Sequence, residues 1–314
     1  MLTFNIAVVF PGQGSQSIGM LKQYAETSDH VEQTFQQAAD VLGYDLWDIV
    51  ANGPQEKLNH TEITQPAMLA ADVAVMRIMT EMCMNKPYAL AGHSLGEYAA
   101  LVASGVLDFQ DAIKLVAQRG RLMQNAVPEG EGAMAAIIGP MDEQVIKVCE
   151  SATAEIGQPV EAVNFNSPGQ IVIAGATAAV DRAIELLVEE GAKRALKLPV
   201  SVPSHSSLMK PAADEMAKVL ETVNFNEPQI QVIHNCDAKS HEDPASIREA
   251  LTKQICNPVR WVQTIKIITE DADAIIECGP GRVLTGLNKR IDKEIKSFAL
   301  DTPASMEKFL DSMS

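Results

Sequence analysis

Short runs of consecutive apolar residues alternate along the chain with longer segments that have the periodicity of helices. Continuous apolar runs of this kind are typical of strands buried on both faces of a parallel sheet. The strands predicted in this way are residues 6–10, 88–91, 231–233 and 274–278, of which only Gln231 and Glu277 are strongly polar. The helical segments between them include residues 31–41, 64–84, 109–125, 247–255 and 283–290. This alternation predicts an α/β protein with a mostly parallel sheet that helices cover on both faces.

The pattern changes after the stretch Pro128–Gly132, whose proline, glycine and glutamate residues are typical of a boundary. The strands and helices predicted beyond it follow the order β-α-β-β-α-β of a ferredoxin-like unit. The strands are residues 133–138, 160–163, 171–174 and 193–198, the helices are 142–152 and 178–190, and a turn is predicted over 164–169. We therefore expect a small domain of residues 128–199 inserted into a larger domain of residues 1–127 and 200–314.

A serine lies at the centre of the motif Gly92-His-Ser-Leu-Gly96, between the apolar run 88–91 and the small-residue helix 98–103. A nucleophile on a tight strand-to-helix turn has a strained backbone, and flanking glycines remove the clashes that such a turn creates. The amides at the start of the following helix face the charge that develops during attack. A five-residue pattern can occur by chance, but the strand–turn–helix context favours Ser94 as a nucleophile.

Two histidines are candidates for the base that a serine nucleophile needs. His205 lies in a rigid segment with two prolines, residues 198–206, just before a predicted helix. His234 follows the predicted strand 231–233. On chemistry alone His205 is the first candidate and His234 its rival.

Arg119 lies on the apolar row of the predicted helix 109–125, between Val116 and Met123. An unpaired buried guanidinium is costly, so Arg119 needs an anionic partner. That partner is either an internal Asp or Glu or a carboxylate on the substrate, gripped bidentately. The pattern alone leaves both alternatives open.

The loop Pro11-Gly-Gln-Gly-Ser-Gln16 follows the first apolar run. It has neither the Lys-Ser/Thr pair of a phosphate-binding loop nor the third glycine of a dinucleotide site. It is either a simple turn at a strand end or a place where the backbone approaches a substrate, with Gln13 offering an amide.

Composition excludes several classes of function. With 41 acidic and 25 basic residues, the formal net charge of −16 argues against nucleic acid as a broad partner. No uncharged apolar run approaches the roughly 20 residues that span a bilayer. The five cysteines have no C-x-x-C spacing, and no cluster of metal ligands is present in the sequence. We expect a soluble, cytoplasmic monomer with reduced thiols, no bound metal and no contact with a membrane.

The motifs together resemble the malonyl-CoA:acyl carrier protein transacylases of bacterial type II fatty acid synthesis, over nearly the whole chain. The resemblance is carried by residues 10–16, 92–97, Arg119, 132–136, 164–169, 202–205, 257–259 and 279–281. It implies a hydrolase-like α/β core, with the small domain packed over it and the active site in the cleft between them.

The resemblance also implies a role for each site residue. Ser94 is the nucleophile that carries the malonyl group, and His205 is its general base. Gln13 and Leu95 supply the amides of the oxyanion hole, and Arg119 binds the malonyl carboxylate. Gln254 supplies a carbonyl that orients His205. Malonyl-CoA is a substrate, acyl carrier protein is the partner, and no permanently bound cofactor is implied.

Two further points stay open in the sequence. A serine esterase or thioesterase would share Ser94 and His205 and use water as the acceptor, but an acidic residue would normally lie between them in chain order. Acyl carrier proteins are acidic, so a chain of charge −16 needs a local basic surface for docking. The candidates for that surface are Lys193, Arg194, Lys197 and Lys210.

Overall fold

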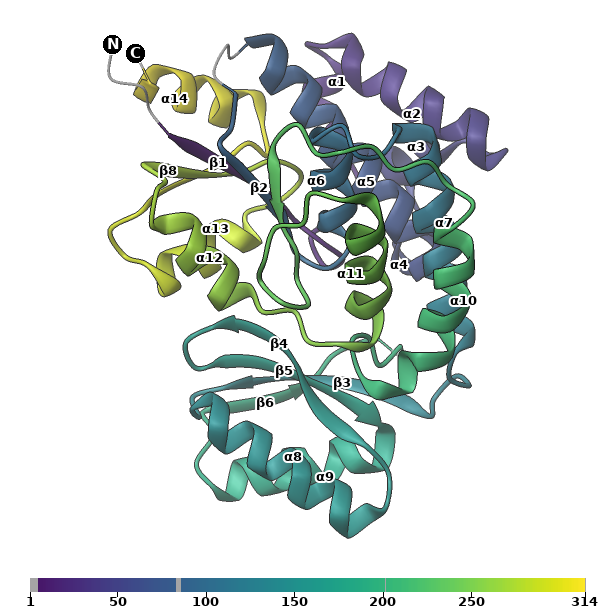
Figure 1. Ribbon diagram of the computed structural model, residues 1–314, viewed down its shortest axis with the longest axis vertical. Helices are drawn as coiled ribbons and strands as arrows, with labels where there is room; N and C mark the ends of the chain where they lie inside the picture. The colour runs from purple at the N-terminus through teal and green to yellow at the C-terminus, as the bar shows by residue number, and fades with distance from the viewer. Residues whose placement is uncertain (1–4, 83–85, 201, 314) are drawn as a thin grey trace.

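Five parallel strands form the main sheet of the computed structural model, which describes residues 5–82, 86–200 and 202–313 (Figure 1). Their order is β7-β2-β1-β8-β9, and every neighbouring pair is parallel. The strands are β1 (Ile6–Phe10), β2 (Ala89–Gly92), β7 (Gln231–Ile233), β8 (Ala274–Glu277) and β9 (Lys296–Ala299). The predicted parallel sheet is confirmed. The edge strand β9 was not predicted, because its partly exposed Lys-Ser-Phe-Ala sequence contains no apolar run.

Helices cover both faces of this sheet, as the alternation of side chains along β1 requires. Ile6, Val8 and Phe10 pack into a core with α2, α5 and α7, whereas Ala7 and Val9 pack on the opposite face against α12 and α13. The helices of this part are α1 (Lys22–Ala25), α2 (Asp29–Leu42), α3 (Leu46–Asn52), α4 (Gln55–Asn59), α5 (Thr61–Met82), α6 (Gly96–Ala103), α7 (Phe109–Asn125), α10 (Lys210–Leu220), α11 (Pro244–Cys256), α12 (Trp261–Thr269), α13 (Val283–Ile291) and α14 (Pro303–Met313).

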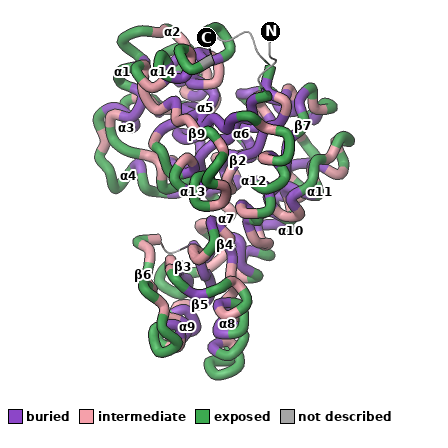
Figure 2. The backbone as a smooth tube through the Cα atoms, turned by 90° about the vertical axis from the view of Figure 1, so that its left-hand side faces the viewer, coloured by how far each residue is buried: buried purple, intermediate pink, exposed green. Residues whose placement is uncertain are grey.

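A second, antiparallel sheet has the strand order β4-β5-β3-β6. Its elements are β3 (Gly132–Ile138), α8 (Asp142–Ile156), β4 (Val160–Ser167), β5 (Gln170–Ala176), α9 (Thr177–Glu189) and β6 (Arg194–Lys197). One face packs against α8 and α9 in a separate apolar core, and the other carries a small apolar cluster with Leu198 and Val200. Figure 2 shows this sheet below the main one, with buried residues inside both parts. The chain is therefore a mixed α/β protein with one parallel and one antiparallel sheet.

Two predicted boundaries were wrong. Residues 164–167 continue β4 instead of forming a turn, because Asn164 and Phe165 pair with β5 across two register shifts. Helix α5 begins at Thr61 and not at residue 64, because the amides of Ile63 and Thr64 donate to the carbonyl of His60 before Pro66 is reached. The predicted end of this helix at Met84 lies outside the described residues, as does Cys83.

The sequence also led us to expect reduced cysteine thiols and no membrane-spanning segment. The four cysteines in the described part, Cys149, Cys236, Cys256 and Cys278, are free thiols. No helix of the described residues is long and apolar enough to cross a membrane.

Asp72 is an unusual carboxyl group in the core of the larger part. It lies on α5, fully buried, and neither carboxyl oxygen has a hydrogen-bond partner among the described residues. A side chain at Gly279 would lie 2.1 Å from its Oδ1 atom. Burial, with a smaller contribution from Glu277, raises the pKa of Asp72 well above its ordinary value. The group is therefore stable as a neutral acid.

We expect Asp72→Asn to stabilise the fold increasingly as the pH rises. The raised pKa means that the folded state holds a proton which the unfolded state releases, so this contribution to stability is lost as the pH rises through the folded pKa. The neutral amide has no such loss. Urea denaturation of both proteins between about pH 5 and about pH 8 measures the difference in free energy of unfolding. Asp311→Asn, at an exposed position, is the control; a difference at Asp72 that does not grow with pH would contradict the prediction.

Candidate active site

The turn between β2 and α6 brings backbone segments into closer contact than any side chain would allow. A Cβ atom at Gly92 would lie 1.9 Å from the carbonyl carbon of Gly96, and one at Gly96 would lie 2.1 Å from the carbonyl oxygen of Phe10. Ser94, at the apex, has φ +52°, in the left-handed region that non-glycine residues rarely adopt. The glycines of the motif are therefore required by the turn, and the serine projects from it at a strained position.

The loop after β1 packs directly on this turn. A side chain at Gly12 would lie 2.4 Å from the carbonyl oxygen of His93 and 3.8 Å from the amide nitrogen of Leu95. Gln13 follows at once, so its main chain lies beside the start of α6. Within the described part of the chain, the amides of Gln13 and Leu95 donate to no protein acceptor. Both amides are thus free of protein acceptors among the described residues.

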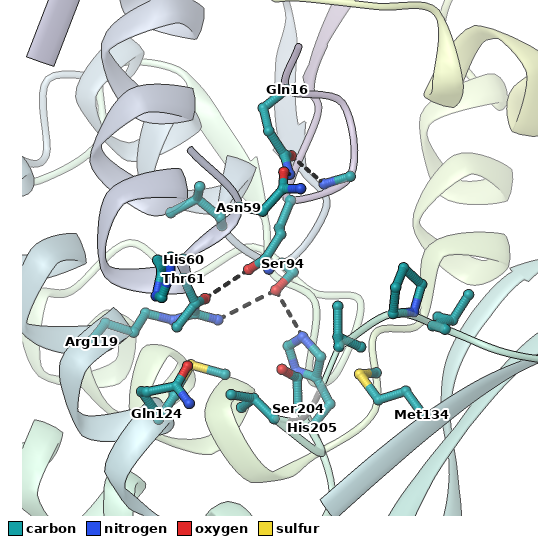
Figure 3. A pocket seen from close by; sticks show the side chains of 18 of the residues that line it. Gln16, Asn59, His60, Thr61, Ser94, Arg119, Gln124, Met134, Ser204 and His205 are labelled. Carbon is teal, nitrogen blue, oxygen red and sulfur yellow. Dashed lines mark hydrogen bonds between the residues drawn. The ribbon is translucent and has the colours of Figure 1, made fainter. Parts of the chain in front are cut away.

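His205 approaches the serine from the segment after β6. Its Nε2 atom lies 2.7 Å from Ser94 Oγ (Figure 3), and its Nδ1 atom lies 2.7 Å from the main-chain carbonyl oxygen of Gln254. Burial, and next the cation of Arg119, lower the pKa of His205 to about 3. The ring is therefore neutral, with Nδ1–H donating to Gln254 and Nε2 accepting from the serine hydroxyl.

Arg119 reaches the same point from α7. Its Nη1 atom donates to Gln65 Oε1 at 2.7 Å, and its Nη2 atom donates to Gln254 Oε1 at 2.9 Å and to Ser94 Oγ at 3.3 Å. The side chain is 2% exposed, and Nε has no partner among the described residues. In that part of the chain no Asp or Glu forms an ion pair with it. The internal carboxylate partner that the sequence left open is absent there.

Asn235, which the sequence analysis missed, and the side chain of Gln254 fix the strained serine. Asn235 accepts from the amide of Ser94 at 2.6 Å and donates to the carbonyl of Gly92 at 2.6 Å. Gln254 Nε2 donates to the carbonyl of Ser94 at 2.8 Å. Both main-chain groups of Ser94 are therefore held by side chains from distant segments. The only local signal was that Asn235 follows a predicted strand.

The rival base His234 lies in a buried network behind the turn. Its Nδ1 atom is 2.7 Å from Glu97 Oε1, and the second oxygen of Glu97 accepts from the amide of Asn235 and from Gln254 Nε2, both at 3.0 Å. His234 and Glu97 are both fully buried. Because its hydrogen bond goes to Glu97 and not to Ser94, His234 does not occupy the position of a base.

His93, beside the nucleophile, connects the turn to the second sheet. Its Nε2 atom lies 2.8 Å from Asn166 Oδ1 on β4. Burial lowers the pKa of His93, so the neutral ring donates this hydrogen bond. The contact exists because residues 164–167 extend β4, the point at which the sequence-based boundary was wrong.

Ser94 lies in a cavity of about 680 Å³ between the two parts of the chain. One wall is polar and comes from the loop after β1 and the start of α5. The opposite wall is apolar and comes from β3 and the segment after β6 (Figure 3). The polar wall includes Gln13, Gln16, Asn59, His60 and Thr61, and the apolar wall includes Met134, Leu198, Pro199, Val200 and Val202. Among the described residues, no group of three or more His, Cys, Asp or Glu side chains could hold a metal ion.

This geometry defines a serine-dependent acyl-transfer site with a built-in cation. The acyl transferase domain family matches residues 7–301, and the chain belongs to that family. It is 55% identical to the malonyl CoA-acyl carrier protein transacylase of Haemophilus influenzae over 309 residues, which cover 97% of this chain and 98% of the relative. The resemblance found in the motifs is thereby confirmed.

Solved structures agree with this relationship. An acyl carrier protein S-malonyltransferase from Vibrio cholerae is 54% identical and superimposes with a TM-score of 0.94, covering 99% of this chain and all of the other. A malonyl-transacylase solved in complex with a type II PKS acyl-carrier protein is 53% identical, with a TM-score of 0.96 over 98% of this chain and 99% of that one.

We expect Gly96→Ala to destabilise the protein by about 1–3 kcal/mol, because the new Cβ atom would overlap the backbone of β1. Gly286→Ala is a matched control, since that position on α13 has open space around a new Cβ atom. In a helix interior, alanine is favoured over glycine by up to about 1 kcal/mol. Chemical denaturation measures the change in free energy of unfolding for each variant. Equal changes would contradict the prediction that a side chain at the turn is excluded by crowding.

Proposed function

We propose that this chain transfers a malonyl group from malonyl-CoA to the phosphopantetheine thiol of acyl carrier protein, through an ester on Ser94. The observation that carries the proposal is the buried guanidinium of Arg119, which lies 3.3 Å from the nucleophile and has only neutral protein partners among the described residues. A substrate with a free carboxylate supplies the missing anion. The names of the relatives support the same substrate and partner.

The first half-reaction uses the groups around Ser94. The malonyl carboxylate binds Arg119, which brings the thioester carbonyl to the serine. His205 removes the hydroxyl proton as Ser94 Oγ attacks, because its neutral Nε2 atom already accepts that hydrogen bond. The amides of Gln13 and Leu95 stabilise the oxyanion, and the loss of one such donor typically lowers kcat by about 10²–10³. Coenzyme A then leaves as the thiol, taking the proton from His205.

The second half-reaction runs the same steps in reverse. The carrier thiol gives its proton to His205 and attacks the malonyl ester. The second tetrahedral intermediate collapses, and Ser94 recovers its proton. The scheme is therefore ping-pong, with a covalent intermediate. Malonyl-CoA takes part only as a substrate, and the scheme requires no permanently bound cofactor.

The architecture that we propose has two units. A hydrolase-like core comprises residues 1–127 and 200–314, and a ferredoxin-like small domain comprises residues 128–199. The strand order β4-β5-β3-β6, with a helix after β3 and after β5, supports the ferredoxin-like assignment. The parallel sheet with Ser94 on a strand-to-helix turn supports the hydrolase-like assignment.

Docking of an acidic carrier protein requires a local positive surface on this acidic chain. Of the four candidates, Lys197 forms an ion pair with Asp181, and Lys210 forms one with Asp214. Lys193 and Arg194 are exposed just before and at the start of β6, at the end of the strand away from the apolar cavity wall, and neither forms an ion pair among the described residues. We therefore propose that Lys193 and Arg194, whose charges are exposed and not paired within the described chain, contribute to the docking surface.

Mass spectrometry after mixing with malonyl-CoA tests the proposal. We expect a malonyl adduct on Ser94, transfer of that group to carrier protein, and no adduct on Ser94→Ala. Arg119→Ala removes the carboxylate partner, so the preference for malonyl over acetyl loading should fall by at least about tenfold, as for other lost charge-assisted contacts. Arg121→Ala, at an exposed position of the same helix, is the control. Release of free malonate instead of transfer would favour the esterase alternative, and an unchanged preference would remove Arg119 from its role.

The rate of Ser94 acylation should be independent of pH between about pH 5 and about pH 8. A base is active in its deprotonated form, and the pKa of His205, at about 3, keeps the ring neutral across this range. Because the Arg119 cation contributes to the low pKa, Arg119→Ala should move the acid limb to higher pH. Single-turnover acylation of the wild-type and Arg119→Ala proteins, measured from about pH 3 to about pH 8, gives the position of the acid limb in each. An acid limb near pH 6.5 in the wild-type protein, the ordinary value for histidine, would contradict the prediction.

A further inference from the structure

A continuous chain of hydrogen bonds connects the guanidinium of Arg119 to the loop after β1. Arg119 Nη1 donates to Gln65 Oε1 at 2.7 Å, and Gln65 Nε2 donates to Thr61 Oγ1 at 3.3 Å. Thr61 Oγ1 then donates to Gln13 Oε1 at 2.8 Å. Arg119 and Gln65 are buried, and Thr61 is 6% exposed, so little water competes with the chain.

The positions of these residues on their helices make the chain possible. Thr61 and Gln65 are one turn apart on α5, so their side chains meet on the same face. Gly120 brings α7 close to the start of α5, since a Cβ atom there would lie 2.9 Å from the carbonyl oxygen of Thr61. Arg119, its neighbour, thereby reaches Gln65.

All three hydrogen bonds point the same way. Each group donates toward Gln13 and accepts from the side of the cation, so the bonds polarise one another in a low-dielectric setting. Gln13, the last residue in this chain of hydrogen bonds, has little other restraint. Gln13 is exposed and lies between Gly12 and Gly14, and Gly14 has φ +107°. Its side chain is tied to α5 at Thr61.

We propose that Thr61 and Gln65 are positioning residues that hold the oxyanion amide of Gln13 in register with the guanidinium of Arg119. The inference rests on the proposed function, in which Gln13 and Arg119 contact opposite ends of the bound malonyl group. Thr61 and Gln65 lie behind those two residues and act only through them. The carboxylate-binding cation and the oxyanion donor are thus parts of one connected unit.

Thr61→Val removes the hydroxyl and so interrupts this chain of hydrogen bonds, with almost no change of side-chain shape. We expect the single-turnover rate of Ser94 acylation by malonyl-CoA to fall about tenfold, a part of the 10²–10³ loss of a whole oxyanion donor. The affinity for malonyl-CoA should stay unchanged, because Arg119 keeps its contact with Gln65. Thr61→Ser retains the hydroxyl and should restore the rate.

Two comparisons separate this coupling from a general loss of structure. Thr64→Val removes a hydroxyl from the same helix that hydrogen-bonds only to the carbonyls of Leu58 and His60, so its acylation rate should match that of the wild type. In an Arg119→Ala background the chain of hydrogen bonds has lost the guanidinium that donates its first bond. Thr61→Val should then cause little further loss, so the two substitutions should be non-additive.

Each outcome decides the inference. A wild-type rate in Thr61→Val, an equal loss in Thr64→Val, or additive losses with Arg119→Ala would overturn it. Should Thr61→Val not fold, Gln65→Met breaks the chain at another link, and a wild-type rate in that variant would overturn the inference equally.

The proposed function can fail separately. If malonyl-CoA leaves Ser94 unmodified, that proposal is wrong, and the burst of acylation by p-nitrophenyl acetate becomes the readout. This ester needs the nucleophile and the oxyanion amides but has no carboxylate for Arg119. A slower burst in Thr61→Val, with rescue in Thr61→Ser, would still support the positioning role of Thr61; an unchanged burst would overturn it.

Discussion

The structure depends on the close packing of three backbone segments around Ser94. The end of β1, the turn after β2 and the loop at Gly12 lie within distances that exclude any side chain at the contact points. This packing forces Ser94 into a left-handed conformation, which costs on the order of 1–3 kcal/mol. The strain is opposed by hydrogen bonds from Asn235 and Gln254 to both main-chain groups of the serine. The same packing places the Gly12–Gln13 segment beside the start of α6, so a single steric constraint positions both the nucleophile and the segments that supply the proposed oxyanion hole.

Electrostatics in the cavity follow from one buried cation. Arg119 donates to amide oxygens and a hydroxyl, and burial lowers its pKa, a shift that Tyr98 and the negative charge of Glu97 oppose only in part. Burial, and after it the field of Arg119, lower the pKa of His205 and keep that ring neutral, as a general base must be. In the proposed reaction the guanidinium therefore does two things: it binds the carboxylate of the acyl group, and it keeps His205 able to take the proton from Ser94.

Local patterns predicted most of the fold, because buried strands and amphipathic helices are encoded in consecutive residues. The parallel sheet, the second sheet and the Ser94 turn were all predicted in this way. Edge strand β9 was missed because few of its side chains are buried, and residues 164–167 were assigned to a turn because asparagines and a serine are common in turns. For Asn235, which holds Ser94 from a distance, the only local signal is its position after a predicted strand, since its partner lies some 140 positions away in the chain. Pairing between distant segments is a property of the folded molecule.

The nature of residue 254 favours transfer of an acyl group. A carboxylate beside His205, as in a hydrolase triad, would also lie next to Arg119 and form an internal ion pair with it. Arg119 would then no longer be available to bind the substrate. Here a main-chain carbonyl orients His205, and the neutral side chain of Gln254 contacts Arg119 without forming an ion pair with it. Gln254 also binds the carbonyl of Ser94 and, through Glu97, the buried network behind the turn. The uncharged residue Gln254 thus hydrogen-bonds to His205, Ser94 and Arg119 at the same time. Because it forms no ion pair, Arg119 stays available to select an acyl group that carries its own carboxylate.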